Sequence, residues 1–425
     1  MELEQMVCCP RTRMKNLLPW LVCLSASSFF FYEFIQGNMF ASIADNIMQD
    51  FHIGVESMAY LSSIYYVSNV LFLFIAGQVL DRYSVKKILI IAMGFCVMST
   101  FVLAYAQSFY VALCCRFITG IGSAFCLLGP VRVASRWFAP QQMAMVTGLI
   151  VTIAMLGGMV SQYPLTMLVM TVGWRQAVLV VGWVGMVMWG VMAIGIIDQP
   201  KDAHPESVNQ LSFLATMKQA YANIQMLRVA LFASLMNMAI AVFGAMMGTL
   251  YLMQRLDVGK ELASSINGML FLGTMLGGPL FGRWSDRSGE RLFPMRVGVA
   301  GAFLVSLVIL YVPVPVWAMY GLFLLLGLFT SAQVISYAYV AERQSRHMTA
   351  TAVSIVSICT QAGCVVFQNA YSHVLVWHQK AQQTHAMASA FSDYQFASSL
   401  IPIGLMVAAL LILGLKETYC HQVEG

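Results

Sequence analysis

The chain has 425 residues, of which 60% are hydrophobic and only 10% are charged, and its mean hydropathy is +0.76. This composition excludes a soluble enzyme or a soluble binding module and indicates a polytopic membrane protein. The formal net charge of +5 reflects where Lys and Arg stand around the predicted spans, so it gives no reason to expect a nucleic-acid partner.

Twelve apolar segments are long enough to cross a bilayer as helices, because about 20 apolar residues span the hydrocarbon core. They lie near residues 17–41, 55–80, 86–106, 108–131, 143–168, 176–197, 229–252, 262–283, 293–312, 315–341, 349–374 and 397–415. If both termini are cytoplasmic, most of the 23 Lys and Arg fall in cytoplasmic loops, and the outer loops keep Arg175, Arg255, Lys260 and Lys380. The sequence therefore predicts an all-α, multi-pass membrane protein with both termini inside.

A short charged motif occurs twice, each time after the second apolar segment of one half of the chain. The first copy contains Gly77, Asp81 and Arg82, and the second contains Gly282, Asp286 and Arg287. The two aspartates are 205 positions apart, close to half of the chain length. The glycines favour close helix packing, and the charged turns are candidate gating loops.

A second feature repeats at almost the same offset. Gly157 and Gln162 of the fifth segment are matched by Gly363 and Gln368 of the eleventh, 206 positions later. Two agreeing offsets predict two pseudo-symmetric six-helix bundles. The expected domains are an N-terminal bundle at 1–197, a central cytoplasmic linker at 198–228 and a C-terminal bundle at 229–425.

Motifs typical of soluble enzymes are absent from the sequence. No glycine-rich loop of the ATP-binding type occurs, and no nucleophile–base pair is visible. His373, His378 and His385 have spacings that match no familiar metal motif, so they are interpreted as surface residues. The sequence predicts neither an enzyme nor a bound cofactor or metal.

Glu33 and Arg116 are the ionisable residues that lie clearly within apolar segments. A charge near the bilayer centre costs on the order of 3 kcal/mol, so such residues usually face a cavity or a partner. Their depths are similar, and they either line a transport cavity, which we favour, or form a structural ion pair within one bundle. Other polar candidates for the cavity are Tyr32, Gln36, Tyr65, Tyr66, Asn237, Gln333 and Tyr337.

Two roles stay open for Glu33 at this stage. Desolvation favours the neutral carboxyl, whereas a nearby Arg116 favours the ionised one, and the outcome depends on their distance. In the first case Glu33 carries a proton during transport. In the second case the pair binds carboxylate or amine groups of the substrate.

The motifs together resemble the major facilitator superfamily. The resemblance rests on the twelve spans, the two signature loops, Gly-Trp-Arg at 173–175, and Arg116 followed by Gly120 and Gly122. It implies alternating access, in which two bundles rock about a midplane site and expose it to one side at a time. It further implies that Asp81 and Arg82, with Asp286 and Arg287 as counterparts, lock the bundles on the cytoplasmic side. Ser84 stands where the family usually has Gly, and the Gly-Pro pair of the antiporter signature is missing, which disfavours drug/proton antiport.

Shorter stretches resemble one branch of that superfamily, which contains nutrient transporters of intracellular bacteria and lysosomal dipeptide carriers. They are 32–34, 44–51 and 393–395. The resemblance implies a monomeric secondary active transporter that moves an amino acid or short peptide, with protons as the coupling ion, in a bacterial inner membrane. An iron-chelate or other nutrient carrier is the alternative substrate class, and a non-transporting sensor on the same fold is the alternative function.

Overall fold

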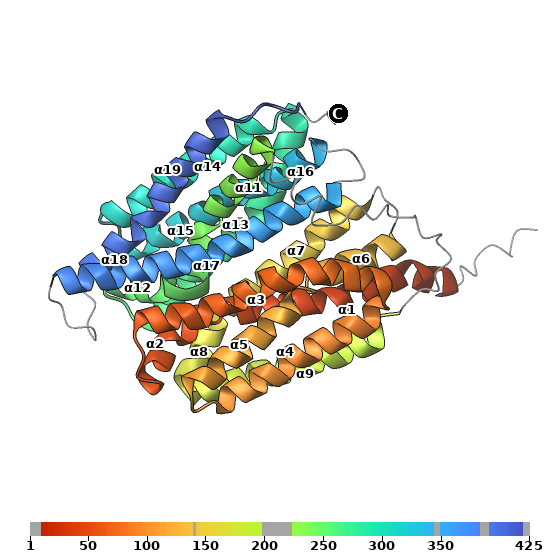
Figure 1. Cartoon of the computed structure of the whole chain (residues 1–425), viewed down its shortest axis with the longest axis horizontal. Helices are drawn as coiled ribbons and strands as arrows, with labels where there is room; N and C mark the ends of the chain where they lie inside the picture. The colour runs from red at the N-terminus through yellow and green to blue at the C-terminus, as the bar shows by residue number, and fades with distance from the viewer. Residues whose placement is uncertain (1–9, 139–141, 198–222, 344–348, 383–390, 420–425) are drawn as a thin grey trace, which may run out of the picture.

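A computed structural model of the chain describes residues 10–138, 142–197, 223–343, 349–382 and 391–419. Within these ranges the side chains of residues 10–16, 74, 78, 81, 82, 144 and 349–353 are not described. The described segments fold into helices joined by short turns (Figure 1). The expectations for Cys8, Cys9 and His385, and for most of the linker 198–228, lie outside the described residues.

The N-terminal half forms one layer of packed helices, drawn from red to yellow-green in Figure 1. These helices are α1 (Pro10–Asn38), α2 (Phe40–Asp50), α3 (Val55–Arg82), α4 (Val85–Tyr105), α5 (Phe109–Ser123), α6 (Leu128–Trp137), α7 (Met143–Val160), α8 (Tyr163–Val172) and α9 (Trp174–Gly195). Helix α1 begins at Pro10, so part of the polar arm expected over residues 1–16 is helical. We call this half the N-terminal bundle.

The C-terminal half forms the second layer, drawn from green to blue. It contains α11 (Ile224–Met236), the π-helix η2 (Ile240–Met247), α12 (Gly248–Leu256), α13 (Lys260–Ser288), α14 (Leu292–Tyr311), α15 (Val316–Thr330), the 3-10 helix η3 (Ser331–Val334), α16 (Ile335–Glu342), α17 (Thr349–Ala381), α18 (Phe391–Ser398) and α19 (Leu400–Leu413). Helix α11 begins before the boundary expected at residue 229, because the Asn223 side chain accepts a hydrogen bond from the Gln225 backbone N–H and caps the helix there. We call this half the C-terminal bundle.

Nine helical stretches in the described part of the chain are long and apolar enough to cross a membrane. Several of them join two consecutive helices, such as α5 with α6 and α18 with α19. Three further long helices, α3, α13 and α17, lie at the remaining positions where the sequence predicts a span. The all-helical membrane architecture expected from composition is therefore confirmed.

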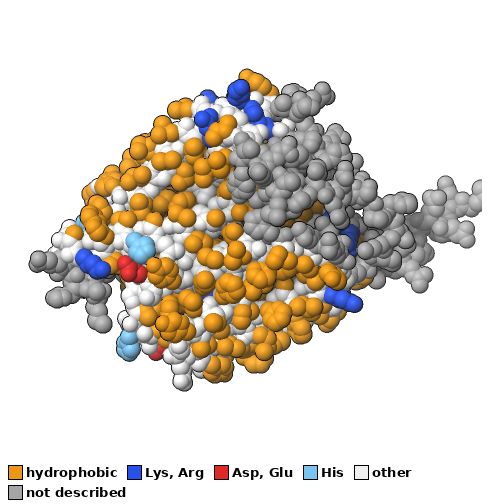
Figure 2. Space-filling view, viewed as in Figure 1, with side chains coloured by type: hydrophobic (Ala, Val, Ile, Leu, Met, Phe, Trp, Pro, Cys, Tyr) orange, Lys and Arg blue, Asp and Glu red, His pale blue; other side chains and the backbone are white. Residues whose placement is uncertain are grey.

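The surface of the molecule suits a lipid environment. Large hydrophobic side chains are exposed on many helices, for example Leu71 at 54%, Phe95 at 58% and Leu410 at 62%. Figure 2 shows hydrophobic side chains spread over the visible face of both bundles, with Lys and Arg at its edges. Because such wide apolar exposure is unfavourable in water, this surface is the one that contacts the bilayer.

The two bundles meet along paired helices. Helix α3 packs along α17, and α7 packs along α13. A Cβ atom at Gly158 would overlap the ring of Phe271 on α13, so this glycine permits the close approach of the two bundles. By contrast, a Cβ at Gly77 or Gly282 would meet no described atom within 4 Å. Among the described residues, no close helix contact is therefore seen at these two signature glycines.

Polar contacts bridge the bundles at one end of the molecule, which we call the joined end. It contains the turns at 51–54, 257–259 and the start of α13. Lys260 Nζ lies 2.6 Å from Asp45 Oδ1, and His373 Nδ1 lies 3.3 Å from Glu56 Oε1. Lys260 and His373 belong to the C-terminal bundle and their partners to the N-terminal one, so these contacts tie the bundles together.

Candidate functional site

Arg116 lies at the centre of the N-terminal bundle, on α5. Its side chain is fully buried, and its Nη1 atom donates a 2.9 Å hydrogen bond to the backbone oxygen of Gln36. The guanidinium carbon lies 4.5 Å from the ring centroid of Phe40 and 4.6 Å from that of Tyr65. Its Nε and Nη2 atoms have no hydrogen-bond partner in the described part of the protein. Arg116 thus retains donor capacity that the surrounding side chains do not use.

Glu33 lies on α1 and also contacts Tyr65. It is 1% exposed, and its Oε2 atom accepts a 3.2 Å hydrogen bond from the Tyr65 hydroxyl. Its Oε1 atom has no hydrogen-bond partner among the described residues. The structure shows no ion pair between the described side chains of Glu33 and Arg116, and Tyr65 contacts both of them, with its hydroxyl on Glu33 and its ring against Arg116. The two charges that the sequence places at similar depth are thus gathered around one tyrosine.

Tyr32 and Gln36 both bond to Thr100 of α4. The Tyr32 hydroxyl lies 2.9 Å from Thr100 Oγ1, and Gln36 Nε2 donates to the same oxygen at 3.0 Å. A Cβ atom at Gly185 would come within 2.6 Å of the Tyr32 ring, so α9 also packs tightly on this side chain. These contacts fix α1 against α4 and α9. Tyr32 and Gln36 therefore support the helix that carries Glu33.

Tyr65 and Tyr66 connect Glu33 and Arg116 to the interface between the two bundles. Their ring centroids lie 5.0 Å apart in an edge-to-face arrangement, and the Tyr66 hydroxyl donates to the Gly37 backbone oxygen at 3.3 Å. Both rings pack against Ala241 of η2 and Cys364 of α17. The tyrosine pair consequently contacts the C-terminal bundle beside Glu33 and Arg116.

Asn237 is the centre of the polar group on the C-terminal side. Its Oδ1 atom accepts a 3.3 Å hydrogen bond from Gln333 Nε2, and its Nδ2 atom lies 3.5 Å from Cys364 Sγ. Because Cys364 also packs against the tyrosine pair, Asn237 and Gln333 lie next to the N-terminal site. Tyr337 is partly buried on α16, one helix later than Gln333.

Gln361, which the sequence pattern did not single out, adds a polar bridge between the bundles. Its Nε2 atom donates to Asn69 Oδ1 at 3.4 Å, and Asn69 Nδ2 donates to Ser123 Oγ at 2.7 Å. The available signal was an amide side chain within an otherwise apolar span, which usually has a polar partner. The candidate site is thus a set of amides, tyrosines and one opposite-charge pair at the contact of the two bundles.

Of the two signature loops, only the second has both of its Asp and Arg side chains described. The side chains of Asp81 and Arg82 lie outside the described residues. In the second loop Asp286 accepts a 2.6 Å hydrogen bond from Arg291 Nη1, while Arg287 is exposed. The residue that organises this loop is therefore Arg291.

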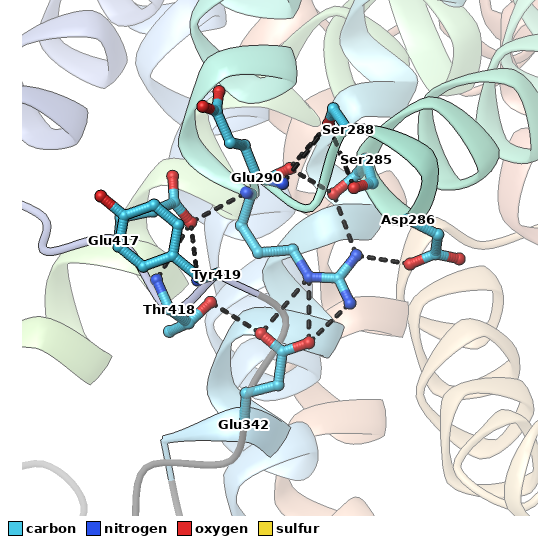
Figure 3. A network of polar contacts seen from close by, with 9 residues as sticks. Ser285, Asp286, Ser288, Glu290, Glu342, Glu417, Thr418 and Tyr419 are labelled. Carbon is cyan, nitrogen blue, oxygen red and sulfur yellow. Dashed lines mark hydrogen bonds and ion pairs between the residues drawn. The ribbon is translucent and has the colours of Figure 1, made fainter.

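Arg291 is buried, and its guanidinium binds Glu342 at the end of α16 through Nε at 3.0 Å and Nη2 at 2.5 Å (Figure 3). Its Nη1 atom also donates to Ser285 Oγ at 2.9 Å. The segment after α19 joins the same group, since Thr418 Oγ1 donates to Glu342 at 2.7 Å. We call Ser285, Asp286, Arg291, Glu342, Glu417 and Thr418 the Arg291 cluster.

Glu417 caps the start of α14 from the C-terminal segment. Its two carboxylate oxygens accept hydrogen bonds from the backbone N–H groups of Arg291 and Leu292, each at 2.8 Å. Partial burial alone raises the pKa of the Glu417 carboxyl, but these N–H groups and those of Thr418 and Tyr419 outweigh it, and the pKa lies below its ordinary value. The carboxylate is therefore ionised at neutral pH and holds the C-terminal segment against the loop.

Two histidines outside the central site, His373 and His378, have carboxylate partners. His378 Nδ1 lies 2.6 Å from Asp393 Oδ1 within the C-terminal bundle, and His373 contacts Glu56 and Tyr60 of α3. Within the described ranges, no group of three or more His, Cys, Asp or Glu side chains could hold a metal ion.

Comparisons with known proteins place the fold. A family model described as Major Facilitator Superfamily matches residues 24–368. Among curated proteins, the chain is 25% identical over 174 residues to the uncharacterized transporter YybO of Bacillus subtilis, covering 41% of this chain and 40% of that one. It is 24% identical over 162 residues to the hexuronate transporter of the same organism, covering 38% of each. Over 194 residues it is 22% identical to the probable sulfoacetate transporter SauU of Cupriavidus necator, covering 46% of this chain and 44% of that one.

These alignments thus span less than half the length of the curated relatives. Solved structures match over almost the whole chain. A bacterial homologue of the human lysosomal transporter Spinster, in an inward-facing and unoccupied conformation, has a TM-score of 0.76 at 16% identity and covers 93% of this chain and 96% of its own. A variant of the nucleoside transporter NupG has a TM-score of 0.73 at 13% identity, with 92% and 99% covered.

Proposed function

The chain belongs to the Major Facilitator Superfamily and is a multi-pass membrane transporter of the secondary kind, and we propose that it carries an amino acid or a short peptide by alternating access. In this proposal the two bundles rock about the site around Tyr65 and expose it to one side of the bilayer at a time. The transported molecule is small and polar, the protein acts as a monomer, and no resident cofactor takes part.

The observation that supports this substrate class is the unused hydrogen-bonding capacity of two residues that contact Tyr65. Among the described residues, two donor atoms of Arg116 have no hydrogen-bond acceptor, and one carboxylate oxygen of Glu33 has no donor within the same ranges. A buried polar group without a partner is costly, so a ligand that satisfies both groups gains that free energy on binding. A zwitterion does so, with its carboxylate on Arg116 and its ammonium group on Glu33.

An organic acid is the second candidate, because two relatives are named for hexuronate and sulfoacetate. Both of these molecules carry a carboxylate, which Arg116 can bind. Neither carries an ammonium group, so Glu33 has no ligand partner in this case. The requirement for the substrate amine therefore separates the two candidates.

We propose that protons are the coupling ion and that Glu33 carries them. Its carboxyl is buried, accepts a hydrogen bond from the Tyr65 hydroxyl, and lies next to the groups that bind substrate in this proposal. Arrival of an ammonium group beside Glu33 favours its ionised form, so substrate binding and proton release are linked. Asp81 and Arg82 then serve as gating residues of the first loop, and Asp286 and Arg287 as those of the second.

Uptake by purified protein in proteoliposomes tests the substrate class. The panel contains amino acids, dipeptides, their N-acetylated forms, hexuronates, nucleosides and iron chelates. We expect accumulation of a free amino acid or dipeptide, loss of transport on N-acetylation, and at least a hundredfold loss in Arg116→Lys. Arg283→Gln, which changes an exposed arginine, is the matched control and should transport normally. Equal transport of the N-acetylated form would refute the zwitterion and favour an organic acid.

Glu33→Gln tests the coupling. If Glu33 carries the proton, this variant should lose proton-driven accumulation and keep solute counterflow. If Glu33 only binds the amine, both should be lost. Accumulation with an unchanged pH profile would show that Glu33 is structural.

We further propose a bacterial inner-membrane location with both termini in the cytoplasm, from the distribution of Lys and Arg. The joined end then faces outward. A cysteine introduced into the linker 198–228 should resist an impermeant thiol reagent in intact cells, and rapid labelling would reverse the orientation.

A further inference from the structure

Gln162 is fully buried at the bundle interface, at the start of α8, and its side chain bonds across that interface. Its Nε2 atom donates to the Gly244 backbone oxygen of η2 at 2.9 Å and to Ser161 Oγ at 3.1 Å. Its Oε1 atom accepts from Asn267 Nδ2 of α13 at 2.7 Å. One residue of the N-terminal bundle thus holds two elements of the C-terminal bundle.

Three amide side chains converge on backbone oxygens of the π-helix η2. Besides the bond from Gln162, Asn267 Nδ2 donates to Phe243 at 3.0 Å, and Gln368 Nε2 donates to Ala241 at 3.0 Å. A π-helix is rarely favoured by the backbone alone and often marks a functional site. Side-chain donors on its carbonyl groups help to stabilise it. Asn267 and Gln368 belong to the same bundle as η2, whereas Gln162 belongs to the other.

The segment η2 also leads directly to the candidate substrate site. Asn237 stands just before it and accepts a backbone hydrogen bond from Ala241 at 3.0 Å. Ala241 packs against Tyr65 and Tyr66, the tyrosine pair beside Glu33 and Arg116. A change in the helical geometry of η2 therefore displaces groups that contact both sides of the site.

We propose that Gln162 is a positioning residue for the conformational step of transport. While the joined end is shut, Gln162 holds η2 in its π-helical form from the opposite bundle. When the bundles part, the bonds to Gly244 and Asn267 break together, η2 relaxes, and Asn237 and Ala241 move in the site. The inference rests on alternating access, which is part of the proposed function, but it does not depend on which substrate is carried.

Closing and opening of the joined end can be measured without a substrate. Tyr110 at the start of α5 is 76% exposed, and Trp317 at the start of α15 is 77% exposed. They belong to different bundles, so spin labels at Tyr110→Cys and Trp317→Cys, with other accessible cysteines replaced, report the distance between the bundles. The full-length protein in lipid nanodiscs is used.

Gln162→Ala should raise the population with the longer label distance roughly tenfold or more, since two cross-bundle hydrogen bonds are lost. Gln368→Ala is the matched control, because it removes one amide bond to η2 from within the same bundle, and it should leave the distance distribution unchanged. Asn267→Ala provides a second test from the partner side and should shift the distribution in the same direction as Gln162→Ala. The double variant should shift it by less than the two single effects combined, because the two residues share a bond.

An unchanged distribution in both Gln162→Ala and Asn267→Ala would overturn the proposal. An equal shift in Gln368→Ala would also overturn it, since any loss of support for η2 would then suffice. If amino acids prove not to be substrates while Gln162→Ala shifts the distribution as expected, the proposed function fails and this inference stands.

Discussion

At the joined end, a few small polar contacts bridge the two bundles, whereas at the opposite end the Arg291 cluster binds segments of the C-terminal bundle to one another. The pair of Lys260 and Asp45 is partly exposed, with side-chain exposures of 10% and 29%, and that of His373 and Glu56 is more exposed, with 53% and 41%. The pair of Arg291 and Glu342 differs from that of Lys260 and Asp45 in its acid, because Arg291 at 9% is as buried as Lys260, whereas Glu342 at 15% is about half as exposed as Asp45.

This difference has a direct consequence for a transporter. An exposed ion pair contributes about 0–1 kcal/mol, so contacts of that kind can be broken and remade in each transport cycle. Breaking a buried pair by removing one partner costs several times more, because a charge is left without compensation. The joined end is thus suited to reversible contact, and the Arg291 cluster to keeping the C-terminal bundle rigid as it moves.

The largest effect is expected from Glu342→Gln. Arg291 would keep Asp286 and Ser285 but lose its buried carboxylate, which should destabilise the protein by roughly 3 kcal/mol. Thermal unfolding of the purified protein measures this. Glu290→Gln, an exposed acid in the same loop, is the control and should unfold like the wild type. Equal unfolding temperatures for all three proteins would mean that the buried pair of Arg291 and Glu342 stabilises the protein no more than the exposed pairs of the joined end.

A smaller effect, on conformation instead of stability, is expected from Lys260→Met. Its Nζ atom bonds to Asp45 at 2.6 Å and to Asn46 at 2.9 Å, and losing a contact of about 1 kcal/mol should increase the parted population roughly fivefold. The label distance between positions 110 and 317 measures it. Lys380→Met, which removes an exposed charge near the same end, should leave the distance unchanged. A large fall in unfolding temperature without a change in label distance would contradict the role of Lys260 in holding the two bundles together.

Glu56→Gln should act in the same direction but more weakly, by about twofold or less, because both partners of this pair are largely solvent-exposed. The same label pair measures it. A shift as large as that of Lys260→Met would mean that solvent exposure does not determine which of the two ion pairs holds the bundles together more strongly. Tyr60→Phe serves as the comparison, since it removes only the 3.4 Å contact between the hydroxyl and His373.

Composition and spacing were sufficient to predict the helical membrane fold and to single out Glu33 and Arg116. Both residues were predicted as unusual charges within apolar helices, and both lie buried beside Tyr65. Their shared contact with that tyrosine was not predictable, because it depends on how α1, α3 and α5 pack.

The Arg291 cluster and the amide contacts on η2 were not predictable either, because they also depend on how distant segments pack. Arg291 and Glu342 are 51 positions apart, and Arg291 and Glu417 are 126 apart, and no local pattern connects them. The repeat offset singled out Gln162 and Gln368 as equivalent positions in the two halves. The π-helix that both contact is stabilised by side chains from three other helices, so its own sequence gives no sign of it.

The smallest effect concerns Glu417 and the pH dependence of the opposite end. The pKa of this carboxyl is lowered in the folded protein, so the folded state binds its proton less readily than the unfolded chain does. Its contribution to stability is then fully present above the ordinary carboxyl range, near pH 4.3, and is lost as the pH falls through the lowered value. The difference in unfolding temperature between the wild type and Glu417→Gln should therefore be largest at neutral pH and shrink as the pH falls below about 4. Glu261→Gln, an exposed acid in the first turn of α13, should differ little from the wild type over the same range. A difference for Glu417→Gln that grows on acidification would have the wrong sign and would show that Glu417 does not hold the C-terminal segment as a carboxylate.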